Sequence, residues 1–147
     1  MTKLTPPNVL RLALLIVLPT VLGCQRLSSE PDPTNELPFG FIDAPPTGAS
    51  VNRQVQMYGW ALDDEGVTEV RFFVDGRFVM RASLDQARPD VAKLYPVYTT
   101  GTNVCGWAVT LPLAAELSTG PHTIIAQAVD KKGATRDLGT ITVALTQ

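Results

Sequence analysis

The chain is poor in the residue types that build reactive sites. Its 147 residues include two cysteines, Cys24 and Cys105, and one histidine, His122. Zinc needs three or four nitrogen or sulfur ligands, and these residues supply too few. The sequence also has no phosphate-binding loop, dinucleotide fingerprint or Gly-x-Ser-x-Gly turn. We therefore expect that the protein binds no cofactor and is not an enzyme. We interpret His122 as a strand-edge residue, although the sequence leaves a Ser-His-Asp set around it open.

The chain also lacks an excess of positive charge. It has 12 basic and 14 acidic residues, which give a net charge of −2. The first 23 residues hold Lys3 and Arg11 and no acid, so without them 10 basic and 14 acidic residues remain and the net charge is −4. Nucleic-acid binding needs a basic face. We expect no nucleic-acid partner, whereas polysaccharide, peptide and protein ligands stay open.

No apolar run is long enough to cross a membrane as a helix. The run at residues 12–21 is short of the about 20 residues that a spanning helix needs. Lys3 and Arg11 precede this run, and Gly23 follows it. A positive leader, an apolar segment and a small residue, in that order, are typical of a secretory signal. We expect residues 1–23 to be a signal peptide.

The end of this signal resembles the lipobox of bacterial lipoproteins, because residues 21–24 read Val-Leu-Gly-Cys. The resemblance implies cleavage before Cys24 and diacylglycerol on its thiol. Acyl chains would anchor the protein to a membrane, since each buried methylene contributes about 0.8 kcal/mol. Gln25, which is not aspartate, implies the outer membrane of a Gram-negative envelope. The alternative is an ordinary secreted protein whose signal ends near a cysteine.

With Cys24 lipidated, Cys105 has no partner for a disulfide within the chain. Cys105 lies in an apolar stretch with no neighbouring cation to lower its pKa, so we interpret it as a small buried apolar residue. Residues 24–38 are rich in proline, acidic and hydroxyl residues and show no apolar period. Such a segment cannot bury enough surface to fold, so we expect a disordered tether. Residues 39–147 would then form the folded domain.

The folded part shows the alternation of β-strands. In residues 54–62 and 67–74, apolar side chains recur at every second position. Asp75-Gly76 follows directly, and such a pair between strands predicts a hairpin with a type I′ turn. Further strands are expected at residues 77–83, 106–111, 121–130 and 138–145, with a short opening strand around Phe41.

Residues 84–104 interrupt this rhythm. Pro89 suits the first position of a helix, Asp90 suits its positive end and Pro96 stops it, so one or two helical turns are expected. About seven strands in little more than a hundred residues predict an all-β fold, a sandwich of two sheets. A small closed barrel is the alternative.

The same residues resemble a bacterial Ig-like module. The segments that carry the resemblance include Gly-Trp-Ala-Leu-Asp-Asp at 59–64, Val-Asp-Gly at 74–76, Arg-Pro-Asp-Val-Ala at 88–92 and Gly-Pro-His at 120–122. It covers nearly all of residues 40–145. It implies an immunoglobulin-like, fibronectin-III-like sandwich of a kind commonly appended to extracellular enzymes and surface proteins, and generally non-catalytic.

The interruption at residues 84–104 offers a candidate binding site for a partner. Arg88, Asp90, Tyr95 and Tyr98 could present charge and aromatic anchors, because tyrosine and arginine are favoured at binding hot spots. A loop of this length is unusual without a role. The structural alternative, which we favour, is that the loop covers a sheet edge and Arg88 pairs with a nearby carboxylate or carbonyl.

The two tryptophans offer a second candidate. Trp60 and Trp107 could stack on sugar rings, but both lie in predicted strands, so packing is favoured. The carboxylates of Asp63, Asp64 and Glu65 could bind calcium or act as acid and base. They directly precede a glycine, and a turn is favoured because aspartate bonds its own backbone there.

These observations predict a lipid-anchored, non-catalytic Ig-like module of the bacterial envelope. It would contact the membrane through Cys24 and bind another envelope protein or serve a structural role. A surface carbohydrate-binding module is the first alternative and a small extracytoplasmic enzyme the second. Exposed aromatic faces would favour the carbohydrate-binding module. A pocket with His122 beside a carboxylate would favour the enzyme.

Overall fold

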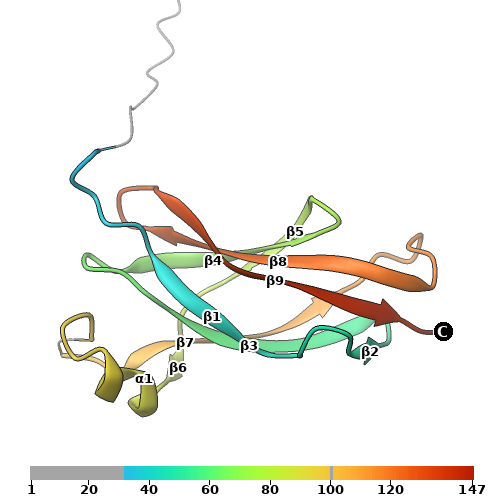
Figure 1. The fold of residues 1–147 in the computed structure, drawn as a ribbon, viewed down its shortest axis with the longest axis horizontal. Helices are drawn as coiled ribbons and strands as arrows, with labels where there is room; N and C mark the ends of the chain where they lie inside the picture. Colours follow the sequence, from blue (N-terminus) through green and yellow to red (C-terminus); the bar gives the residue numbers. More distant parts are fainter. Residues whose placement is uncertain (1–31, 100) are drawn as a thin grey trace, which may run out of the picture. The chain divides into compact units, whose positions relative to one another are not determined.

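The computed structural model describes residues 32–99 and 101–147, so the expected signal peptide, Cys24 and Gln25 lie outside it. The described chain forms two sheets, a four-stranded sheet with the order β1-β3-β7-β6 and a five-stranded sheet with the order β2-β9-β8-β4-β5 (Figure 1). The elements are β1 (Phe39–Ala44), β2 (Ser50–Val51), β3 (Gln54–Leu62), β4 (Val67–Val74), β5 (Arg77–Ala82), β6 (Gln86–Ala87), α1 (Pro89–Leu94), β7 (Val104–Pro112), β8 (Gly120–Asp130) and β9 (Thr135–Leu145).

The predicted all-β sandwich is confirmed. Seven strands have six or more residues, and β2 and β6 add two residues each at sheet edges. The two sheets are separate, so the alternative of a closed barrel is wrong. The short helix predicted within residues 84–104 is α1, which begins with Pro89 and has Asp90 in its first turn. In the described part of the chain, no helix is long and apolar enough to span a membrane.

The alternating patterns place one face of each long strand in the interior. In β3, Val55 and Met57 are buried, while Gln54 and Gln56 between them are exposed. The Asp75-Gly76 pair makes the turn between β4 and β5 with φ angles of 49° and 77°. Positive φ at both central residues is what a type I′ hairpin turn requires, which confirms that prediction.

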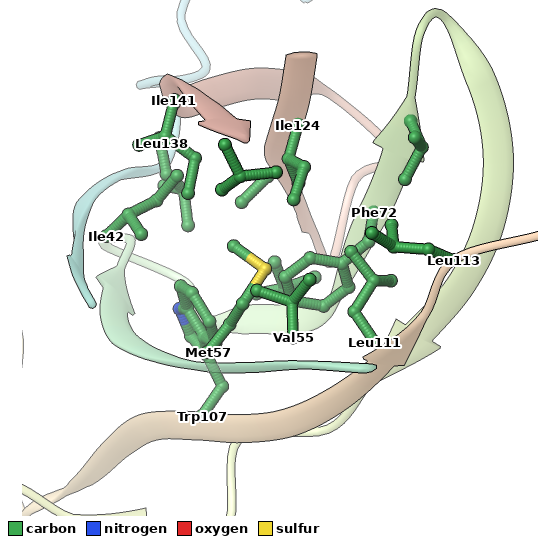
Figure 2. Packing of buried hydrophobic residues seen from close by; sticks show 14 of the residues in the cluster. Ile42, Val55, Met57, Phe72, Trp107, Leu111, Leu113, Ile124, Leu138 and Ile141 are labelled. Carbon is green, nitrogen blue, oxygen red and sulfur yellow. The ribbon is translucent and has the colours of Figure 1, made fainter. Parts of the chain in front are cut away.

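The main core fills the space between the two sheets (Figure 2). Trp107 and Phe72 meet at its centre, with ring centroids 5.2 Å apart and planes at 69°. Gly59 leaves room for the indole, since a Cβ there would lie 2.4 Å from Trp107 Cζ2. Other large side chains that are almost fully buried are Met57, Leu111, Ile124, Val55, Val70 and Val143.

Residues 32–38 lie against the domain, although we expected a disordered tether up to residue 38. Asn35 Nδ2 donates a hydrogen bond of 2.5 Å to Asp130 Oδ2, and Pro38 is almost fully buried. Lys132 Nζ lies 3.7 Å from Asp32 Oδ2. These partners come from the far end of the sequence, so a local reading of composition could not find them. The folded unit therefore includes residues 32–38.

Candidate binding surface

A second hydrophobic cluster covers the outer face of the four-stranded sheet, the face that points away from the main core. We call this group the outer cluster; its buried members are Leu62, Val91 and Cys105. Leu62 ends β3 and Cys105 lies in β7, whereas Val91 reaches the sheet from α1. Burial raises the pKa of the Cys105 thiol, so this cysteine packs as an apolar residue. Residues 88–99, the α1 loop, are thereby tied to the sheet.

Aromatic rings extend the outer cluster around Phe39. The ring centroid of Phe39 lies 4.9 Å from that of Tyr98, 5.4 Å from that of Tyr95 and 6.0 Å from that of Trp60. Trp60 and Tyr95 are themselves 5.5 Å apart. Three candidate binding residues thus meet in one cluster around a phenylalanine that sequence reasoning had not singled out. Their rings pack mainly against each other.

Arg88 holds the start of the α1 loop by ion pairs. Its guanidinium donates two hydrogen bonds to Asp90, of 3.0 and 2.7 Å, and one of 2.6 Å to Asp43 of β1. The bonds to Arg88 lower the pKa of Asp90 to about 2, and Asp90 and Asp43 raise the pKa of Arg88. Asp43 is reached because β1 has an irregularity between Ile42 and Ala44. Nε, Nη1 and Nη2 of Arg88 are thus engaged within the domain.

Phe41 and Tyr58 are the most exposed aromatic residues of this face. They are 59% and 53% exposed, compared with 36% for Tyr95. Phe41 pairs with Trp60, and Tyr58 lies two residues from Trp60, so both point outward as diagonal neighbours. Phe41 also lines a cavity of about 330 Å³ between β1 and β9. Sequence reasoning missed both residues; for Tyr58, the signal was an aromatic next to the glutamines on the exposed side of the 54–62 alternation.

Trp107 lies on the opposite side of the same sheet from Trp60. It is fully buried in the main core, so neither face of its indole is open to a ligand. Its Nε1 has no hydrogen-bond partner in the structure. The two tryptophans offered together as a sugar platform are therefore separated by the sheet.

Asp63, Asp64 and Glu65, the candidate calcium ligands, lie in the turn between β3 and β4. Asp63 Oδ1 accepts hydrogen bonds of 3.0 Å from the backbone N–H of both Glu65 and Gly66. Burial raises the pKa of Asp63, while Glu65 pairs with Lys132 at 2.7 Å. Asp64 is exposed. Within residues 32–99 and 101–147, no three His, Cys, Asp or Glu side chains are grouped as metal ligands would be.

His122 is buried at the start of β8 and bonded at both ring nitrogens. Nδ1 lies 2.7 Å from Asp75 Oδ2, and Nε2 lies 2.7 Å from the carbonyl oxygen of Ser118. The bond to the Ser118 carbonyl and the pair with Asp75 raise the pKa of His122, and the pKa of Asp75 is lowered by His122. Asp75 Oδ1 also accepts from the Thr123 N–H. The arrangement fastens the β4–β5 turn to β8 and to the loop before it.

No curated protein matches the chain. Among solved structures, dimeric latent PorU from Porphyromonas gingivalis is 14% identical with a TM-score of 0.50, and the match covers 82% of this chain and 11% of that one. CbhA fibronectin(III)-like modules of Clostridium thermocellum are 17% identical with a TM-score of 0.47, covering 76% of this chain and 47% of that one.

A lytic polysaccharide monooxygenase of Jonesia denitrificans is 17% identical, with a TM-score of 0.44 and coverage of 67% of this chain and 58% of that one. The chain therefore covers less than two thirds of each of these structures. A family model described as a bacterial Ig domain matches residues 38–126, which is more than half of the chain. The sandwich and this match agree with each other, and the chain belongs to the bacterial Ig domain family.

Proposed function

We propose that the chain is a lipid-anchored, non-catalytic module of the bacterial envelope that binds another envelope protein through the outer face of its four-stranded sheet. The observation that carries the binding surface is that two neighbouring aromatics, Phe41 and Tyr58, are more exposed than the other aromatics of this face, whose rings pack together. Exposed aromatics of this kind anchor protein interfaces, because they bury much area while losing little side-chain entropy.

The surroundings of the pair favour a protein partner. The Arg88–Asp43 ion pair lies on the same face and offers a polar border, as the rims of interfaces do. Phe41 and Tyr58 belong to β1 and β3, whose other side packs in the main core, so the surface would be largely ordered before binding. In this proposal, Arg88, Asp90, Tyr95 and Tyr98 support the binding surface and do not form its centre.

Two groups that could support chemistry are already engaged, which favours a non-catalytic module. His122 is bonded at both ring nitrogens, and Cys105 is buried with a raised pKa. The family match agrees with a module that binds or supports. A small enzyme is therefore the least favoured of the three functions.

The lipid anchor rests on the signal pattern and on the Val-Leu-Gly-Cys sequence at residues 21–24. Expression in a bacterium fed an alkyne-tagged fatty acid tests it. We expect the tag on the wild-type protein, in the outer-membrane fraction, and no tag on a Cys24→Ala variant. A Cys105→Ala variant serves as the control and should keep the tag. An untagged wild-type protein would overturn the anchor.

The binding surface is tested with a photo-crosslinking amino acid in the living cell. One variant carries it at Tyr58 and the control carries it at Phe78, which is 51% exposed on the five-stranded sheet. We expect a discrete protein adduct from position 58 that Phe41→Ala abolishes, and none from position 78. Equal adducts from both positions, or none from position 58, would contradict the proposed surface.

A carbohydrate ligand is the second candidate for the same surface. The Gln56 and Thr110 side chains, bonded to each other at 3.1 Å, lie exposed beside Tyr58 and could bond sugar hydroxyls. Retention of the wild type, but not of a Phe41→Ala, Tyr58→Ala double variant, on purified envelope polysaccharide would favour this candidate. No retention of either protein would remove it.

A further inference from the structure

We propose that the α1 loop of the anchored protein contacts the lipid surface through Leu94 and Val97, and so sets the orientation of the module on its membrane. This inference rests on the proposed anchor at Cys24. Leu94 and Val97 are 74% and 79% exposed, more than any other exposed large hydrophobic side chain of the described residues. Isolated apolar side chains at a surface are common, so their position relative to the anchor decides what covers them.

The α1 loop adjoins the segment that leads to the anchor. The hydroxyl of Tyr98, the residue after Val97, lies 3.2 Å from Glu36 Oε2. The Phe39 ring packs against Tyr98 at 4.9 Å. The described chain enters with Asp32 and Asn35 beside the β8–β9 turn and reaches Tyr98 at Glu36, so the entering segment and the α1 loop belong to the same end of the domain (Figure 1).

The length of the connection keeps this end near the membrane. Seven residues lie between Cys24 and Asp32, the first described residue, so the chain takes eight residue-to-residue steps from one to the other. A fully extended chain spans at most about 3.6 Å per residue, so this stretch reaches no more than about 29 Å. The end where the chain enters therefore stays within about 29 Å of the anchored residue, whereas no such limit holds the opposite end of the sandwich.

The opposite end of the sandwich lies far from the point where the described chain enters. The β4–β5 turn and the loop between β7 and β8 lie there, with the C-terminus (Figure 1). Strands such as β8, with 11 residues, separate the two ends by about 35 Å at 3.3 Å per residue. Phe78, beside the β4–β5 turn, would therefore lie far from a membrane that contacts Leu94 and Val97.

The chemistry of the loop suits the boundary between headgroups and acyl chains. Leu94 and Val97 are apolar, Tyr95 between them has a ring with a polar tip, and Lys93 precedes them. Apolar side chains flanked by tyrosine and lysine are typical of segments that lie in this interface. Two side chains bury too little area to hold a protein on a membrane alone, but the tether raises their effective concentration at the surface.

Depth-dependent quenching of the lipidated full chain tests the inference. Val97→Cys is labelled with an environment-sensitive fluorophore, and Glu116→Cys in the exposed β7–β8 loop is the matched control. Cys105 is buried and Cys24 would be acylated, so each variant offers one reactive thiol. The proteins are reconstituted in vesicles of phosphatidylethanolamine and phosphatidylglycerol, with and without nitroxide-labelled lipid, and are separated by flotation.

We expect floating protein whose label at position 97 is blue-shifted and loses fluorescence to nitroxide lipid, while the label at position 116 does neither. Adding Leu94→Ser should reduce the quenching at position 97 without changing flotation. Floating protein with equal signals at the two positions would overturn the membrane contact and leave the anchor intact. A position 97 shielded only after envelope proteins are added would also overturn it. Protein that does not float would overturn the anchor together with the contact.

Discussion

Two hydrophobic clusters lie on opposite sides of the four-stranded sheet, and they differ in what covers them. The main core is shared with the five-stranded sheet, so Trp107 and Phe72 are held by strands from both layers. The outer cluster is covered by one loop, which Val91 and the Arg88 ion pairs hold in place. The main core therefore depends on the whole fold, whereas the outer cluster depends on a local segment.

This difference indicates which part of the surface can move. A segment held by few buried side chains can open without global unfolding. The α1 loop is such a segment, because Val91 is the buried residue of α1. The exposed aromatics of the proposed binding surface belong instead to β1 and β3, which the main core holds. Binding through Phe41 and Tyr58 thus uses the more rigid part of this face.

The largest effect is expected from the tryptophans that flank the sheet. Trp107→Ala should lower the free energy of unfolding by about 3–5 kcal/mol, because it empties the centre of the main core. Trp60→Ala is the matched variant on the outer side and should cost clearly less, since its ring is partly exposed. Chemical denaturation gives the free energy of unfolding of both variants. Equal losses would contradict the claim that the main core contributes more to stability than the outer cluster.

Substitution of Gly59 tests how closely the Trp107 ring packs against the backbone of β3. Gly59→Ala should destabilise the protein by about 1–3 kcal/mol through overpacking, since its Cβ would lie 2.4 Å from the Trp107 ring and 2.1 Å from the Phe41 carbonyl oxygen. Gly139→Ala is the control, because its nearest neighbour, Ile42, would lie at 3.4 Å. Thermal unfolding of both variants should separate them, and a harmless Gly59→Ala would contradict the packing described.

Val91 tests the outer cluster alone. Val91→Ala should cost about 1–2 kcal/mol, and the loss should appear as local opening of the α1 loop. Hydrogen exchange should quicken at the N–H groups of Ala92 and Tyr95, which bond to the carbonyls of Arg88 and Val91. Exchange in β8, between the other strands of its sheet, should change much less. Equal acceleration in both places would mean that the loop and the core open together.

The His122 pair lies outside both clusters and should give the fold its own pH dependence. Its raised pKa means that its stabilisation is fully present below the ordinary histidine value of about 6.5 and is lost as the pH rises through the folded pKa. Asp75→Asn should cost about 1 kcal/mol near pH 6, a low figure because Asp75 is 41% exposed.

Asparagine tolerates the positive φ of position 75, so the turn itself should survive. Denaturation midpoints measured between about pH 6 and 8 should fall with pH in the wild type and fall less in Asp75→Asn. An unchanged slope in the variant would show that the pair does not carry the dependence.

The sequence predicted the strands well because strand periodicity is local. Alternation in 54–62 and 67–74 and the Asp75-Gly76 turn each depend on adjacent residues, and β3, β4 and the hairpin lie where they were expected. The candidate site was less predictable. Which of Trp60 and Trp107 faces the main core depends on which sheet face meets the other layer, and a single strand does not reveal this.

Contacts between distant segments could not be predicted from the sequence either. Asn35 bonds to Asp130 across 95 residues, so the composition suggested a tether up to residue 38 although residues 32–38 lie against the domain. The outer cluster joins Leu62, Val91 and Cys105 from three elements, and each alone is an ordinary apolar residue. Phe41 and Tyr58 stand out only once the α1 loop is seen to cover the other aromatics.

The most direct test of the account is the affinity of the module for the protein that crosslinks at position 58. Titration of that partner should give at least about tenfold weaker binding for the Phe41→Ala, Tyr58→Ala double variant, which corresponds to about 1.4 kcal/mol. Phe78→Ala on the other sheet should bind like the wild type, and all three proteins should unfold at similar temperatures. Full affinity of the folded double variant would contradict the proposed binding surface.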